Sequence, residues 1–140
     1  MSLVDVEALV SYYLRSQSEV TAYVGQRVYT SLPKDRTFPL VRLTRVGGVP
    51  KLSRPLHVDS AHLQVDVFGG SKATAMNAMN AIREELAKLV DEDPVQPLGV
   101  VCGVKFGPLA YLPDESFTPA KPRYVQDVTV TVRPAPLPTT

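Results

Sequence analysis

Residues 57 to 90 constrain the fold of this chain most, because their hydrophobic periodicity changes from that of a strand to that of a helix. From His57 to Phe68 apolar and polar residues alternate, which is the pattern of a strand with one buried face. The expected buried side holds Ala61, Leu63, Val65 and Val67, and the other side holds His62, Gln64, Asp66 and Phe68. Such a strand needs an apolar partner on one side only.

A long amphipathic helix is expected directly after this strand. Gly69 and Gly70 break the alternation, and Ser71 is a residue type that caps helix N-termini well. Apolar residues then recur at helical spacing over about 20 residues. They are Ala75, Met76, Met79, Ile82, Leu86, Leu89 and Val90. The strand and the helix can bury their apolar sides against each other, which favours a layered fold.

Further helices and strands are expected on both sides of this unit. Ser2 and Asp5 suggest a helix-capping start before the apolar positions Val6, Leu9, Val10, Tyr13 and Leu14, and a second short turn over residues 19–24 ends at Gly25. Strands are expected over 27–32, 40–46, 99–112 and 124–133, the last two paired antiparallel across the proline-rich segment 113–122, with Val128, Val130 and Val132 facing the core. Residues 47–55 contain two glycines and two prolines and are expected to form a long exposed loop.

This order of elements predicts an α+β fold in two layers. We expect a mostly antiparallel sheet of about five strands, packed with one long and one short helix. A chain of 140 residues is expected to form one domain over 1–140, with an extended proline-rich tail at 134–140. No apolar run approaches the roughly 20 residues of a membrane-spanning helix, so no membrane contact is expected.

Signatures of catalysis and of ligand binding are weak in this sequence. The single cysteine, Cys102, lies in an apolar stretch and is expected in the core. His57 and His62 are five residues apart on a strand and point to opposite faces, as do Asp59 and Asp66. Gly69 and Gly70 precede a helix but lack the spacing of a phosphate-binding loop. We therefore expect no catalytic residue, no metal site and no cofactor, and the chain is not expected to be an enzyme.

Charge is distributed unevenly along the chain although its net charge is only +1. Residues 34–54 hold six basic residues and one acidic residue, whereas residues 84–93 hold five acidic residues and one basic residue. Two solvated faces are the simplest interpretation. A head-to-tail ring would instead bring opposite patches of neighbouring subunits together. The candidate subunit or ring contacts are Arg36, Arg42, Arg45, Lys51, Arg54, Glu84, Glu85, Asp91, Glu92 and Asp93.

Four stretches resemble the tail terminator (tail completion) proteins of long-tailed bacteriophages. SEVTAYVGQRVYTSLPKD is similar to the opening of that family, and FPLVRLTRVGG to its second strand. HLQVDVFGGSKATAMNAMNAIREEL resembles its central strand and helix, and RYVQDVTVTVRP its closing strand. The resemblance covers nearly the whole chain, but it is one of pattern and short stretches and includes no catalytic motif.

The resemblance implies a structural protein of the virion, located at the head-proximal end of the tail and assembled in the host cytoplasm. Such a protein forms a homo-oligomeric ring, a hexamer in this family, that caps the tail tube and stops its polymerisation. Its implied partners are other copies of itself, the tail tube protein and the head–tail connector protein, and DNA passes through the lumen without specific binding. Whether residues 47–55 line the lumen or reach a neighbouring ring is left open.

Three other interpretations are compatible with the sequence. Another neck or tail component, such as a head-closure or tail tube subunit, shares small α+β architecture and ring assembly. A nucleic-acid-binding module could use the basic residues, although aromatic residues make up only 7% of the chain. A small hydrolase would need a reactive Cys102, which thiol labelling would detect.

Overall fold

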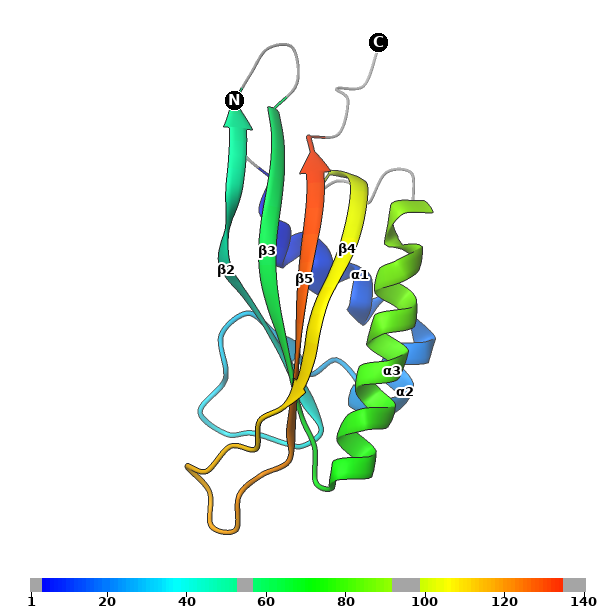
Figure 1. Ribbon diagram of the computed structural model, residues 1–140. Coiled ribbons are helices and arrows are strands. Elements are labelled where there is room, and N and C mark those ends of the chain that lie inside the picture. The colour runs from blue at the N-terminus through cyan, green and yellow to red at the C-terminus, as the bar shows by residue number, and fades with distance from the viewer. Residues whose placement is uncertain (1–3, 53–56, 92–98, 135–140) are drawn as a thin grey trace.

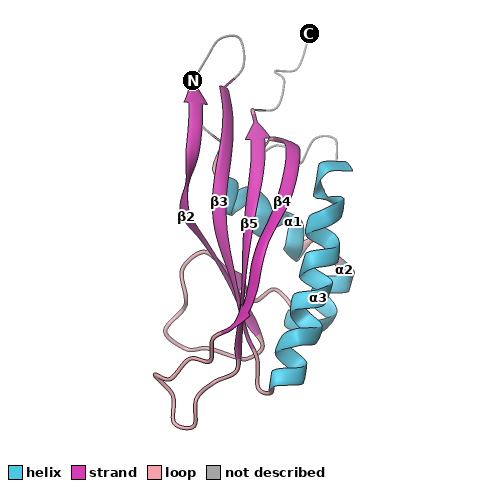
Figure 2. Cartoon of the chain, in the orientation of Figure 1, coloured by secondary structure: helices cyan, strands magenta, loops and turns pink. Residues whose placement is uncertain are grey.

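The computed structural model describes residues 4–52, 57–91 and 99–134 of the chain. Three α-helices lie in this part: α1 (Val6–Arg15), α2 (Ser18–Val24) and α3 (Lys72–Lys88), the last followed by a 3-10 turn at Leu89–Asp91. Five strands accompany them: β1 (Val28–Tyr29), β2 (Leu40–Leu52), β3 (His57–Phe68), β4 (Val100–Tyr111) and β5 (Arg123–Arg133). Figure 2 shows the helices gathered beside a single long sheet.

The sheet has the strand order β1-β2-β3-β5-β4. Its pairs are antiparallel except β1 with β2, which is parallel, so the sheet is mixed. The predicted α+β class with a mostly antiparallel five-stranded sheet is confirmed. The predicted strand at 57–68 coincides with β3, and the predicted pairing of the last two strands is that of β4 with β5.

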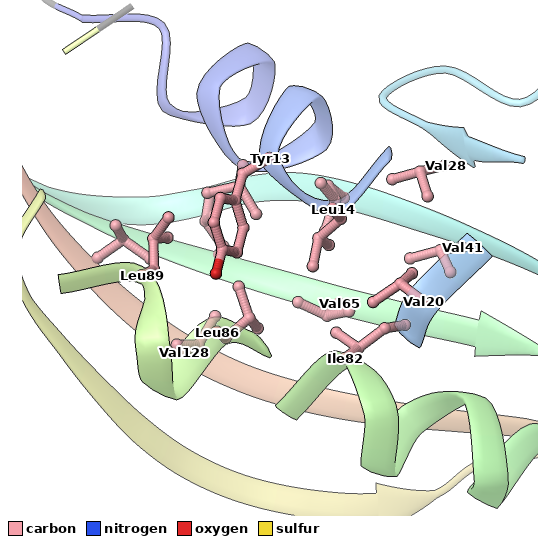
Figure 3. Packing of buried hydrophobic residues seen from close by; sticks show 14 of the residues in the cluster. Tyr13, Leu14, Val20, Val28, Val41, Val65, Ile82, Leu86, Leu89 and Val128 are labelled. Carbon is pink, nitrogen blue, oxygen red and sulfur yellow. The ribbon is translucent and has the colours of Figure 1, made fainter. Parts of the chain in front are cut away.

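One face of the sheet carries the hydrophobic core, and the described helices lie on that face (Figure 1). Alternate residues of β3 and β5 point toward the helices and are buried, as the alternation predicted. Figure 3 shows Leu14, Ile82 and Leu86 of the helices packing over Val65 and Val128 of the sheet. Of the predicted helix stripe, Val90 lies outside the core and is 42% exposed.

Local capping chemistry places the helix ends. The Asp5 side chain caps α1 by accepting a hydrogen bond from the Ala8 backbone N–H at 3.1 Å, and Ser2 lies outside the described residues. Ser71 caps α3 as predicted, accepting from the Thr74 N–H at 3.1 Å. Helix α2 ends at Gly25, whose φ of 58° is a conformation that glycine adopts without steric cost.

The predicted loop at 47–55 is wrong for its first six residues. Strand β2 continues to Leu52, and its register with β3 runs from Gly47 opposite His62 to Leu52 opposite His57. A bulge between Arg45 and Gly47 absorbs one residue, after which the pairing resumes. Beyond Arg42 this strand has no described strand on its outer side, and edge strands tolerate proline. Glycine and proline here therefore mark a bulged edge strand, and residues 53–55 lie outside the described residues.

Candidate functional site

The sheet face that points away from the helices is the candidate interaction surface. Because side chains alternate along a strand, His62, Gln64 and Asp66 of β3 point to this face while their neighbours enter the core. None of the described helices covers it (Figure 1). We call it the open face, and define it by the side chains of Arg42, Thr44, Ser60, His62, Gln64, Asp66, Phe68, Lys105, Arg123, Asp127, Thr129 and Thr131.

An ion cluster lies at one end of the open face. Strand register places Arg42 of β2 directly opposite Asp66 of β3, and Arg123 of β5 opposite Phe68. The Asp66 carboxylate accepts hydrogen bonds from Arg42 Nε at 3.1 Å and from Arg123 Nη2 at 2.8 Å. The Asp66 side chain is fully buried, whereas those of Arg42 and Arg123 are 32% and 22% exposed. A single carboxylate thus holds two guanidinium groups.

Phe68 and Gln64 complete this cluster. The guanidinium carbons of Arg42 and Arg123 each lie 5.6 Å from the centre of the Phe68 ring, within the range of cation–π attraction. The Gln64 amide donates to Asp66 Oδ1 at 3.1 Å. Two positive charges around one negative charge leave an excess of one positive charge in a partly desolvated place. Such an excess favours an anionic partner at this end of the open face.

A second ion pair lies on the helix side of the sheet and fixes the edge of β2. Arg45 Nη1 and Nη2 contact the two carboxylate oxygens of buried Asp59 at 2.5 and 2.8 Å. The hydrogen bond to Asp59 raises the pKa of Arg45 above its ordinary value. The Arg45 backbone N–H donates to the Glu7 carboxylate of α1 at 2.6 Å. The Glu7 side chain therefore accepts the hydrogen bond from an edge N–H of β2 that a neighbouring strand would otherwise accept.

Two loops meet at the end of the molecule where α3 begins (Figure 1). The rings of Phe38 and Phe117 meet edge to face with centres 5.8 Å apart. Lys121 Nζ lies 4.4 Å from the centre of the Phe38 ring. Asp114 accepts from the Ser116 hydroxyl at 2.7 Å, and this bond holds the pKa of Asp114 below its ordinary value. These contacts tie the connection between β1 and β2 to that between β4 and β5.

The predicted contact residues are spread over several environments. Arg36 and Glu84 are exposed, whereas Arg42 and Arg45 are held in the two ion pairs. Glu85 is 4% exposed, accepts a hydrogen bond from the Tyr13 hydroxyl at 3.4 Å and lies 3.4 Å from Lys88 Nζ. The side chains of Lys51 and Asp91 are not described, and Arg54, Glu92 and Asp93 lie outside the described residues. A role for these ten residues in ring contacts stays a prediction.

Sequence reasoning missed Asp66 and Arg123 as members of a cluster. Local spacing showed that Asp66 points away from the core, which the structure confirms. It did not show that Arg42 and Arg123 flank Asp66, because the three residues come from three strands. The available signal was an acidic residue, Asp66, two positions before an aromatic residue, Phe68, on the same side of β3. Arg42 and Arg123 lie near the starts of β2 and β5.

The expected burial of Cys102 is wrong, because this residue is exposed. The register shifts between Val101 and Gly103, so that Cys102 is the extra residue of a bulge in β4. Val101 stays opposite Val132 and is 3% exposed, which keeps the apolar position of the strand in the core. Alternation alone therefore placed the cysteine on the wrong side.

We expect Cys102 to react with a water-soluble thiol reagent in the folded protein, at a rate within about tenfold of that in the unfolded chain. Exposure gives the reagent direct access, so no unfolding has to precede the reaction. The measurement uses a thiol reagent that releases a coloured group when it reacts. Because the chain has one cysteine, the colour reports the reaction of Cys102 alone. A thiol that stays unreactive until denaturant is added would contradict the bulge at Cys102.

Residues 4–52, 57–91 and 99–134 contain no group of three His, Cys, Asp or Glu side chains that could hold a metal ion. In the same part of the chain, no helix has both the length and the apolar character needed to cross a membrane.

A shallow depression of about 250 Å³ on the open face is lined by His62, Lys105, Phe106, Gly107, Pro108, Asp127, Val128 and Thr129. His62 Nε2 lies 3.8 Å from Asp127 Oδ1 in it.

Comparison with known proteins identifies a family and solved structures with a related fold. The family model described as "Tail completion protein gp17" matches residues 8–95, more than half of the chain. A solved structure titled "Virion of native gene transfer agent (GTA) particle" contains a chain with 21% sequence identity and a TM-score of 0.73. The match covers 91% of this chain and 94% of that chain, and it shows a shared fold. No curated protein matches.

Proposed function

The chain belongs to the tail completion protein gp17 family and is a structural protein of a phage tail, and we propose that it caps the tail tube and ends tube polymerisation. The observation that carries this proposal is the family match, which spans α1 through α3. The fold shared with a chain of a gene transfer agent virion gives further support, because a single compact α+β unit is used in that particle too.

A capping protein must bind the end of the tube on one side. Its other side must not bind a further tube subunit. We propose that copies of the chain form a closed ring, a hexamer, whose one side meets the tube and whose other side meets the head–tail connector. A ring built head to tail uses two different surfaces of each subunit and closes without free ends. DNA passes through the lumen without base-specific contacts.

The part of the β2–β3 hairpin from the bulge at Val46 onward is our candidate for an axial contact of this ring. Val46 and Val49 of β2 are 51% and 64% exposed, and an exposed apolar edge strand favours pairing with another chain. Exposed apolar side chains gain from burial against protein and gain nothing from a DNA backbone. We therefore propose that this hairpin contacts the tube or the connector, and that it does not bind DNA.

The direct test is assembly of tail tubes from purified tube protein with and without this chain. Added at one ring per tube end, the chain is expected to stop growth, and electron micrographs should show short tubes with an added density at one end. Light scattering on the chain alone reports its mass across concentration and salt. Bovine serum albumin at equal mass is the control for crowding.

Tubes that grow to the same length with the chain as without it would contradict the capping role. A chain that leaves tubes unchanged and binds the purified connector would instead be a head-closure subunit, which is the alternative within the same class of neck proteins. Salt-sensitive DNA binding by a monomer would favour the nucleic-acid module instead.

A further inference from the structure

We propose that the open face of one copy is covered by the outer side of helix α3 from a second copy. This inference rests on the proposed ring and assigns its subunit contact. Five exposed residues of α3 form the surface involved, which we call the outer stripe: Ala73, Asn77, Asn80, Glu84 and Ala87. Their spacings of four and three residues put them on one side of the helix, opposite the buried side.

The open face is more than the solvated side of an antiparallel sheet. Many antiparallel sheets leave one face in water, so an uncovered face alone implies no partner. Here, however, Asp66 and Phe68 are 0% and 4% exposed although they lie on the uncovered side. Both lie against Arg42 and Arg123, whose combined charge exceeds that of Asp66 by one. On the same face Lys105 of β4 adds an exposed positive charge and Asp127 of β5 a partly exposed negative charge, so the excess over the whole face remains one positive charge.

The outer stripe of α3 has the chemistry to meet this face. Glu84 is its single charged member, and the other four side chains are small, so that a flat sheet can approach the helix closely. The stripe therefore offers a negative charge to a face with an excess of positive charge. The three basic side chains of the open face outnumber its two acids by one, so its net charge is opposite to that of the stripe, which favours docking of unlike surfaces over docking of two identical ones.

Arg83 gives an independent sign that an acceptor is missing beside the stripe. Its Nε is buried and has no hydrogen-bond partner among the described residues. Buried polar groups in folded proteins are nearly always paired, so this guanidinium N–H needs an acceptor that the described residues do not supply. Arg83 lines a depression of about 320 Å³ together with Asn80, Glu84, Ala87 and Phe106. A neighbouring copy that fills this depression would contact the exposed part of the Arg83 side chain.

The arrangement also allows head-to-tail assembly. The helices lie on one face of the sheet and the open face lies on the other, so the two contact surfaces are on opposite sides of each subunit (Figure 1). A contact between unlike surfaces repeats from copy to copy and generates a ring when the rotation closes. Each sheet in the ring would then lie between its own helices and those of its neighbour.

The test exchanges charges across the proposed contact. Light scattering then measures the mass of the oligomer as a function of protein concentration. Glu84→Arg and Lys105→Glu are each expected to raise the concentration for half assembly by about tenfold or more. The double variant is expected to recover most of the loss, because both signs are exchanged. Glu19→Arg is the matched control, since Glu19 is an exposed helical acid outside the stripe. Unchanged thermal unfolding shows that each variant folds.

Equal effects of Glu84→Arg and Glu19→Arg would overturn this inference, as would a double variant that assembles no better than its parents. A wild-type chain that stays monomeric at all concentrations, with and without tail tubes, would overturn it too. The proposed capping role is judged separately by tube length. Rings of the Glu84→Arg variant that still form and still stop tube growth would leave the function standing and reject the contact.

Discussion

Asp66→Asn is expected to lower the free energy of unfolding by about 3–5 kcal/mol, the range for breaking a buried ion pair by removing one partner. The asparagine keeps the shape but not the charge, so Arg42 and Arg123 remain packed around a neutral group. Their mutual repulsion is then uncompensated around a fully buried position, and the 32% and 22% exposure of the two side chains screens it only in part. Thermal unfolding should show a fall of roughly 10 °C or more for a chain of this size.

Asp127→Asn is the matched control for this experiment. Asp127 lies on the same face, two strands from Arg42, but its side chain is 35% exposed. Exposed ion pairs contribute about 0–1 kcal/mol, so this variant should unfold near the wild-type temperature. If Asp66→Asn unfolded at the same temperature as Asp127→Asn, the cluster would not stabilise the sheet, and its charge would have no structural role.

The elements that sequence predicted well are those fixed by neighbouring residues. Strand β3 follows from alternation, and α3 follows from its N-cap at Ser71 and its apolar stripe. In both cases the residues that determine the element lie inside it. The α+β class then followed, because a half-apolar strand and a half-apolar helix bury each other.

The parts that sequence did not predict depend on register and on bulges. Cys102 and the continuation of β2 beyond Val46 were both misassigned. The prediction assumed strict alternation along each strand, whereas the extra residue of a bulge moves the following side chains to the other face of the sheet. Glu85 was assigned to a surface patch, yet a turn of α3 places it at the edge of the core beside Tyr13. Charge counting along the chain does not distinguish a buried acid from an exposed one.

The candidate site was foreseen only in part. Arg42 was among the predicted contacts, but its partners Asp66 and Arg123 come from other strands, and the open face exists only once β2, β3 and β5 are aligned. Glu84 was predicted as a contact from charge alone. The structure adds the small exposed residues on its side of α3 and the orphaned Nε of Arg83.

Gly48→Ala is expected to destabilise the β2–β3 hairpin by about 3 kcal/mol or more, because two costs add at this position. The φ of Gly48 is 107°, a conformation that costs a residue with a side chain about 1–3 kcal/mol. A Cβ atom here would also collide with the Ser60 carbonyl oxygen and lie 2.8 Å from the His62 backbone nitrogen. Both atoms belong to the facing strand, so relief requires the two strands to separate. Hydrogen exchange of the β2 and β3 amides, together with thermal unfolding, measures the loss.

Gly47→Ala is the matched control, because it makes the same chemical change one residue away. A Cβ at Gly47 would have its nearest contact at 3.9 Å from the His62 Cβ, which is ordinary packing distance. This variant should therefore keep the exchange protection of the hairpin. If both variants behaved alike, residues 47–52 would not be held in the ladder that the structure shows, and the exposed loop expected from glycine and proline would describe them better. Loss of protection in Gly48→Ala alone would show that Gly48 permits the close approach of β2 to β3. This approach also fixes the exposed Val49 opposite Ser60 in the strand pair.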